Sequence, residues 1–128
     1  MPQTDLYGFA LLASDMAPDV ECIDGLLFLD RGHLGHDALR ARVQTFSSPI
    51  EAQSWMNLVP IDDFIDCGVA NWSSSDSALS ALVDTYRRSW LSIVRAKFGD
   101  VPGVSVDILV DDDAGDVLLR LTQTQRIA

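Results

Sequence analysis

The sequence predicts an α+β domain with a mainly antiparallel sheet of about five strands, two helices packed on one face, and the order β-β-β-α-α-β-β. Three observations predict it: apolar runs of strand length early in the chain, a long helical stripe in its second half, and two alternating runs near its end. The chain has 128 residues, of which 48% are hydrophobic, and this is enough for one core without metal or disulfide. We expect a single domain over residues 1–128.

Three stretches early in the chain are expected to be strands. Residues 6–13, LYGFALLA, and residues 22–30, CIDGLLFLD, are apolar runs followed by turn residues. In residues 38–46, ALRARVQTF, apolar and polar residues alternate, which favours a half-exposed strand. A helix also fits the spacing of Leu39, Arg42, Val43 and Phe46. Both alternatives remain open for this stretch.

The first helix is predicted from its N-terminal signals. Ser48 can act as the N-cap, Pro49 takes the first helical position and Glu51 completes a capping box. The helix should end near Asn57, because a proline follows three residues later. Residues 61–75 show no clear period and are expected to form an irregular connection that places Phe64, Ile65 and Trp72 against the core.

The clearest element is a second helix over residues 76–98. Its apolar stripe recurs at three- and four-residue steps and consists of Leu79, Leu82, Val83, Tyr86, Trp90, Ile93, Val94 and Phe98. Gly99 occupies the usual left-handed stop, and Pro102 follows. The second half carries Arg87, Arg88, Arg95 and Lys97. Asp84 lies four residues before Arg88, so we expect an ion pair that balances this basic helix face.

The last predicted element is a β-hairpin. Residues 104–110, VSVDILV, and residues 116–124, DVLLRLTQT, both alternate between apolar and polar positions. The sequence DDDAG between them contains a glycine suited to a turn. A calcium loop counted from Asp111 would need glycine at position six and glutamate at position twelve, but these positions hold Asp116 and Thr122. The acids are therefore interpreted first as a solvated turn.

A second interpretation of the acids is a docking surface for a basic protein. Clustered carboxylates can meet Lys or Arg on a partner, and IDDFID over residues 61–66 repeats this acidic chemistry around two apolar residues. The simplest alternative for that segment is that its apolar residues only fill the core. The predicted partner-binding residues are Asp62, Asp63, Asp66, Asp111, Asp112, Asp113 and Asp116.

No catalytic or metal-binding motif is recognised. His33 and His36 are expected in an exposed, glycine-bearing turn rather than on a helix face, without further ligands nearby. No nucleophile elbow and no glycine-rich phosphate loop is present in the sequence. We therefore expect no cofactor, no metal and no enzymatic activity.

The charge of the chain restricts its partners. There are 17 Asp and 2 Glu against 8 Arg and 1 Lys, which gives a net charge of −10. Such a chain repels nucleic-acid phosphate and anionic lipid, so we expect neither nucleic acid nor membrane as a direct partner. The apolar run at residues 9–13 is too short to span a membrane and follows an acid rather than a basic run. A cytoplasmic location is expected, with Cys22 and Cys67 reduced.

These features favour a small protein-binding module. An antitoxin- or immunity-like inhibitor would use the charge most directly, because its carboxylates could occupy the phosphate site of a basic, nucleic-acid-acting protein. The alternatives are a small-ligand-binding or regulatory domain, which would contain a deep apolar pocket, and a self-assembling subunit, which would expose apolar side chains. Charge and fold class alone do not decide between them.

Overall fold

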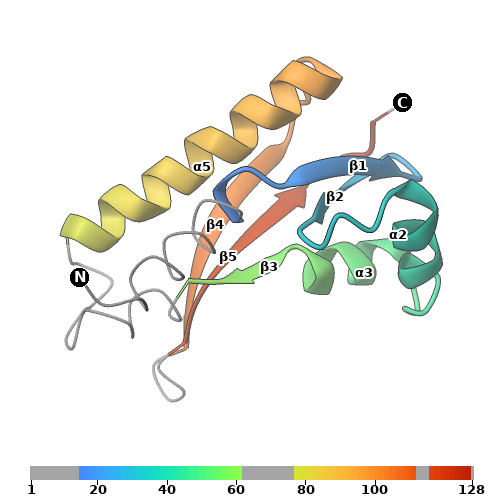
Figure 1. Ribbon diagram of the computed structural model, residues 1–128, viewed down its shortest axis with the longest axis horizontal. Helices are drawn as coiled ribbons and strands as arrows, with labels where there is room; N and C mark the ends of the chain where they lie inside the picture. Colours follow the sequence, from blue (N-terminus) through green and yellow to red (C-terminus); the bar gives the residue numbers. More distant parts are fainter. Residues whose placement is uncertain (1–14, 62–76, 112–115, 128) are drawn as a thin grey trace.

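The structure is a computed structural model that describes residues 15–61, 77–111 and 116–127. Within these ranges the chain is α+β with antiparallel sheets, as predicted (Figure 1). The element order is β1-β2-α2-α3-β3-α5-β4-β5, so the predicted order β-β-β-α-α-β-β with two helices is wrong. The helices are α2 (His36–Val43), α3 (Pro49–Met56) and α5 (Ser77–Phe98). The strands are β1 (Asp19–Ile23), β2 (Leu26–Asp30), β3 (Leu58–Pro60), β4 (Val104–Asp111) and β5 (Asp116–Gln123). The strand predicted over residues 6–13 lies outside the described residues.

The described strands form two sheets, and the prediction of one five-stranded sheet with both helices on one face is wrong. β1 and β2 form a hairpin, while β3, β5 and β4 form a second sheet in that spatial order. Leu27 and Leu29 of β2 pack in one core cluster with α5, whereas Leu26 and Phe28 pack with α2 and α3. Every residue of β2 is therefore buried, which explains its apolar run without alternation.

Amide side chains join β2 to β5 in place of a main-chain ladder. Asn57 accepts a hydrogen bond at Oδ1 from Leu29 N (2.9 Å), and its Nδ2 donates to Leu27 O (2.9 Å) and Leu121 O (3.1 Å). Gln123 Oε1 accepts from Leu27 N at 2.6 Å. These side chains satisfy main-chain groups of β2 that would otherwise be buried without partners, so the sheet can divide here.

Residues 22–30 contain a turn, so the prediction of one continuous strand is wrong. Asp24 and Gly25 have φ values of 54° and 80° and separate β1 from β2. Two successive residues with positive φ form the tight turn that suits a two-residue hairpin, and Asp-Gly is a favoured sequence for it. The Asp-Gly pair was the signal that distinguishes a hairpin from a single strand.

Residues 38–46 begin as helix, so the favoured strand prediction is wrong and the helical alternative is confirmed. Leu39 and Val43 lie four positions apart and are both buried in the cluster that contains Ile23 and Phe28. The residues between them are exposed. A helix places Leu39 and Val43 on one face, toward the core, and leaves Ala41 exposed, as observed. A strand would place Ala41 on the same face as Leu39 and Val43.

The signals for α3 are confirmed. Ser48 Oγ accepts a hydrogen bond from Glu51 N at 3.1 Å, Pro49 is the first helical residue and Asn57 is the C-cap. The Glu51 carboxylate accepts a hydrogen bond from Ser47 Oγ rather than closing the capping box on Ser48. Local capping chemistry was therefore sufficient to predict the bounds of this helix.

The long helix α5 and its stop at Gly99 are also confirmed. Gly99 has a φ of 75°, and its N–H donates to Arg95 O at 2.9 Å. Trp90 and Tyr86 are fully buried, and their rings pack edge to face with centroids 5.7 Å apart. The indole N–H of Trp90 donates to Asp15 O at 2.9 Å, so the largest core side chain has its polar atom satisfied.

Candidate protein-binding surface

The described residues that border the predicted acids lie at one end of the second sheet. Asp111 and Asp116 are the last pair in the β4–β5 register. Ile61 N donates to Val117 O at 2.9 Å, so the chain that continues from β3 leaves the sheet beside this pair. The remaining predicted acids lie outside the described residues: Asp62, Asp63, Asp66, Asp112 and Asp113. The predicted turn at residues 112–115 and the predicted core contacts of Phe64, Ile65 and Trp72 also lie outside the described residues.

Asp111 and Asp116 occupy directly opposite positions in the β4–β5 register. Residues directly opposite in an antiparallel ladder are close neighbours, and like charges at such positions destabilise the pair. The β-hairpin itself is confirmed over its described strands, which are paired from Val104 with Gln123 to this last position. A hairpin needs no pair of acids at its end, so the turn alone does not account for them.

On the basic face of α5, the acid pairs with a different arginine from the one predicted. Asp84 pairs with Arg87, with Nη1 and Oδ1 3.0 Å apart, and not with the Arg88 guanidinium through its carboxylate. Arg88 Nε instead lies 3.4 Å from the Asp84 main-chain oxygen. Lys97 Nζ donates to Val20 O at 2.6 Å and thereby covers part of the outer edge of β1.

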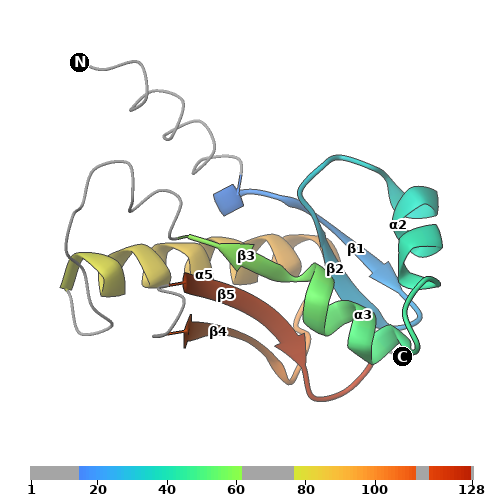
Figure 2. The same ribbon diagram turned by 90° about the horizontal axis from the view of Figure 1, so that it is seen from below.

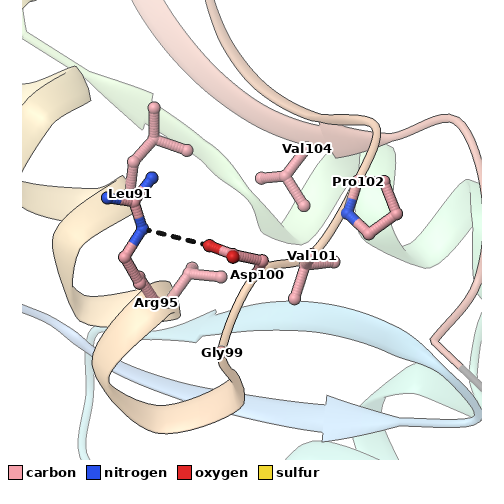
Figure 3. A pocket seen from close by; sticks show the side chains of 8 residues that line it. Leu91, Arg95, Gly99, Asp100, Val101, Pro102 and Val104 are labelled. Carbon is pink, nitrogen blue, oxygen red and sulfur yellow. Dashed lines mark ion pairs between the residues drawn. The ribbon is translucent and has the colours of Figure 1, made fainter.

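A hollow of about 500 Å³ lies where α5 ends and β4 begins (Figure 3). Its lining is mostly apolar and comprises Leu91, Val94, Arg95, Gly99, Asp100, Val101, Pro102 and Val104. Arg95 Nε and Asp100 Oδ1 form an ion pair at 3.4 Å, with both side chains more than three quarters exposed. A pair so exposed contributes little to stability, so these groups can be rearranged by a ligand at low cost.

The hollow could not be predicted from the sequence. Its residues come from the end of one element, a loop and the start of the next, so no spacing in the sequence connects them. The sequence GDVPG after the helix was the only available signal, because a glycine stop followed by proline turns the chain sharply. That signal predicts a turn but not a cavity.

The histidines do not share a site in the structure. His33 has a φ of 52° and its Nδ1 lies 2.9 Å from Asp19, in the exposed turn that was predicted. His36 is instead the first residue of α2, and its Nδ1 lies 3.4 Å from Glu21. The prediction that both lie in a turn is therefore wrong for His36. Within the described ranges, no three His, Cys, Asp or Glu side chains converge as a metal site.

One buried titratable group is strongly perturbed, but it lies in the core. Burial raises the pKa of the Tyr86 hydroxyl, and the nearby Asp15 carboxylate raises it further. Tyr86 contacts Trp90 and does not line the hollow. Its perturbation therefore follows from core packing. Cys22 lies half-buried on β1, whereas Cys67 is outside the described residues.

Comparison of the chain with protein-family models, with curated proteins and with solved structures found no match. Of the helices that the structure describes, none has the length and apolar character needed to cross a membrane.

Proposed function

We propose that this chain is a protein-binding module that docks on a basic partner, in the manner of an antitoxin- or immunity-like inhibitor of a nucleic-acid-acting protein. The observation that carries the proposal is the Asp111–Asp116 pair at the end of the β4–β5 ladder, beside the point where the chain continues from Ile61 to Asp62 and Asp63. Like charges placed in register reduce stability, and a binding role gives a reason for keeping them.

The overall charge supports the same class of partner. At −10 the protein attracts basic surfaces over a distance set by the ionic strength, which is about 10 Å at 0.1 M salt. Carboxylates at a phosphate site would compete with nucleic acid for the same Lys and Arg side chains. The inhibitor class therefore predicts that this protein and nucleic acid exclude each other from the partner.

The test begins with the partner recovered by native co-purification at low salt, followed by association kinetics with the purified proteins. The double variant Asp111→Asn and Asp116→Asn should associate roughly threefold more slowly at low salt, with a weaker dependence on ionic strength, because complementary charge acts mainly on the association rate. Its fold should persist, because the substitution removes a repulsion.

The matched control is the double variant Asp24→Asn and Asp37→Asn, which also removes two negative charges. These charges lie at the β1–β2 turn and on α2, far from the β4–β5 end (Figure 1). Asn tolerates the positive φ of Asp24. Equal rates and equal salt dependence for both double variants would refute the proposal. A stable ternary complex of this protein, the partner and nucleic acid would refute the inhibitor mechanism.

A second candidate function is self-assembly, which one observation favours. Ile50 and Trp55 on α3 are 62% and 60% exposed, and a tryptophan is a common anchor of protein interfaces. This candidate predicts an oligomer in sedimentation experiments that dissociates in Trp55→Ala. A parent that sediments as a monomer at high concentration would reject it.

A further inference from the structure

The outer edge of β4 presents a row of main-chain hydrogen-bonding groups. Thr124 N donates to Gly103 O at 2.9 Å. Because hydrogen-bonded pairs alternate along an antiparallel ladder, this bond determines which β4 residues bond to β5. Odd-numbered β4 residues therefore bond to β5, and the N–H and C=O groups of even-numbered residues point away from the sheet. The outward residues are Val104, Val106, Ile108 and Val110.

This edge is less protected than the other edges of the two sheets. β3 is a three-residue strand that ends in Pro60, and the β1 edge is partly covered by Lys97 at Val20 O. β4 is eight residues long, and Figure 2 shows no helix or strand of the described residues beyond it. Within the described residues, one group on this edge has a partner, namely Val106 O, which accepts from Arg87 Nε at 3.0 Å.

The two faces of β4 differ in chemistry. Val104, Val106 and Ile108 point toward the α5 side and belong to its core cluster or pack against it. Ser105 and Asp107 lie on the other face and are exposed. A strand added to this edge would therefore meet apolar side chains on one face and a carboxylate on the other. The hollow described above lies at the Val104 end of the same edge.

We propose that the β4 edge binds an extended segment of the partner as an added antiparallel strand, with apolar side chains facing α5 and Lys or Arg side chains facing Asp107. One apolar side chain of the segment occupies the hollow between α5 and residues 99–104. Main-chain bonds provide affinity in this mode, and the pocket and the carboxylate provide selectivity. Arg87, which is partly exposed, swings away from Val106 O when the strand binds.

Charge complementarity selects the occupant. β4 carries Asp107 and Asp111 and no base, Arg120 of β5 lies opposite Asp107, and Arg87 contacts the edge at Val106 O. The net charge of −10 therefore supplies the preference for a basic segment over an acidic one, and Asp107 supplies its local contact. A second copy of this chain is disfavoured, because it would bring a second β4 with the same acids and a second net charge of −10 to the edge. The basic character of the segment rests on the proposed function, whereas strand addition itself follows from the edge.

The probe is a capped synthetic peptide of alternating arginine and valine, seven residues long, titrated against the full chain by calorimetry and by amide NMR. Binding should perturb the amides of the outward residues and slow their hydrogen exchange about tenfold or more. In the antiparallel arrangement each valine lies opposite an outward β4 residue, with its side chain facing α5. The main-chain groups of the valines therefore bond to β4, and those of the arginines point away. N-methylation of the valines should therefore abolish binding, and N-methylation of the arginines should leave it nearly unchanged.

Variants of the protein provide the second arm. Val110→Pro removes one outward N–H but none of the β4–β5 bonds, so the fold should persist while peptide affinity falls about tenfold. Val110→Thr keeps the N–H and is the matched control, with affinity near that of the parent. Asp107→Asn should weaken binding at low salt only.

The outcomes separate this inference from the proposed function. Equal binding of both N-methylated peptides, or an affinity of Val110→Pro equal to that of the control, overturns strand addition. Equal binding of an alternating glutamate and valine peptide overturns the assignment of a basic segment. Protection of the outward amides in a dimer of the free protein also overturns the proposal. None of these results affects the association kinetics of the Asp111 and Asp116 variant, which test the proposed function separately.

Discussion

The β1–β2 hairpin and the three-stranded sheet have similar apolar sequences, but their faces and edges differ in how far they are covered. β2 is buried on both faces, its side toward β5 bonds to amide side chains, and Lys97 covers part of the β1 edge. The second sheet packs α5 on one face, and β4 forms a long outer edge beside an apolar hollow. The comparison therefore contrasts a hairpin whose outer main-chain groups bond to side chains with a sheet whose β4 edge is largely unpaired in the described residues, and this edge is the one that we propose for binding.

The largest expected effect is on the shared core. Trp90→Ala removes a fully buried indole and the hydrogen bond to Asp15 O, and should lower the free energy of unfolding by about 3 to 5 kcal/mol. Denaturant unfolding of parent and variant measures this loss. A change below about 1 kcal/mol would mean that α5 does not hold the two regions together.

The next effect concerns the join between the regions. Asn57→Ala leaves Leu29 N without its partner and removes the donor to Leu27 O and Leu121 O, so we expect a loss of about 3 kcal/mol. Gln125→Ala, at an exposed position, is the control and should be nearly neutral. Similar unfolding midpoints for the two variants would show that the amide link is not needed.

Two glycine substitutions compare the closed hairpin turn with an open loop. At Gly25, with φ of 80°, an added Cβ would lie 2.8 Å from Ile127 O, so Gly25→Ala should cost about 2 kcal/mol or more. At Gly99, with φ of 75°, no atom lies within 4 Å of the added Cβ, so only backbone strain of about 1 kcal/mol is expected. Equal losses in the free energy of unfolding for the two variants would show that the close approach of Ile127 O to Gly25 adds nothing to the cost of the substitution.

The smallest effect is expected at the histidines. Their partners are the exposed carboxylate of Asp19 and the partly exposed carboxylate of Glu21, so His33→Asn with His36→Asn should change the free energy of unfolding by about 0.5 kcal/mol or less. Metal analysis of the purified parent supplies a second check. Stoichiometric zinc that is lost in the double variant would contradict the assignment of these residues to the surface.

Local signals in the sequence predicted the parts of the fold that local chemistry determines. The N-cap at Ser48, the stripe of α5, the stop at Gly99 and the β4–β5 pairing were all correct. The division into two sheets was not predicted, because it depends on Asn57 reaching two strands far away in the sequence. For residues 38–46 a strand was favoured over the helical alternative because the alternating polar residues also fit a strand, and only the position of the hairpin core decides between the two.

The candidate surface was predictable only in its charge. The acids at Asp111 and Asp116 are visible in the sequence, but their register beside Ile61 requires the paired strands. Which edge of the sheet is outermost depends on the strand order, and neither composition nor periodicity determines that order when five strands can pair in several ways. The hollow at Val104 was missed for the same reason, because it forms between elements.

Hydrogen exchange of the free protein tests most directly whether β4 is an open edge and the β1–β2 hairpin a closed one. Along β4 we expect alternation: the amides of Ser105, Asp107 and Leu109, which bond to β5, exchange slowly, while those of Ile108 and Val110 exchange at rates close to those of exposed amides. In β2, the amides of Leu27 and Leu29 should be protected through their side-chain acceptors. Uniform protection along β4 would show that the edge is covered, and would contradict the account.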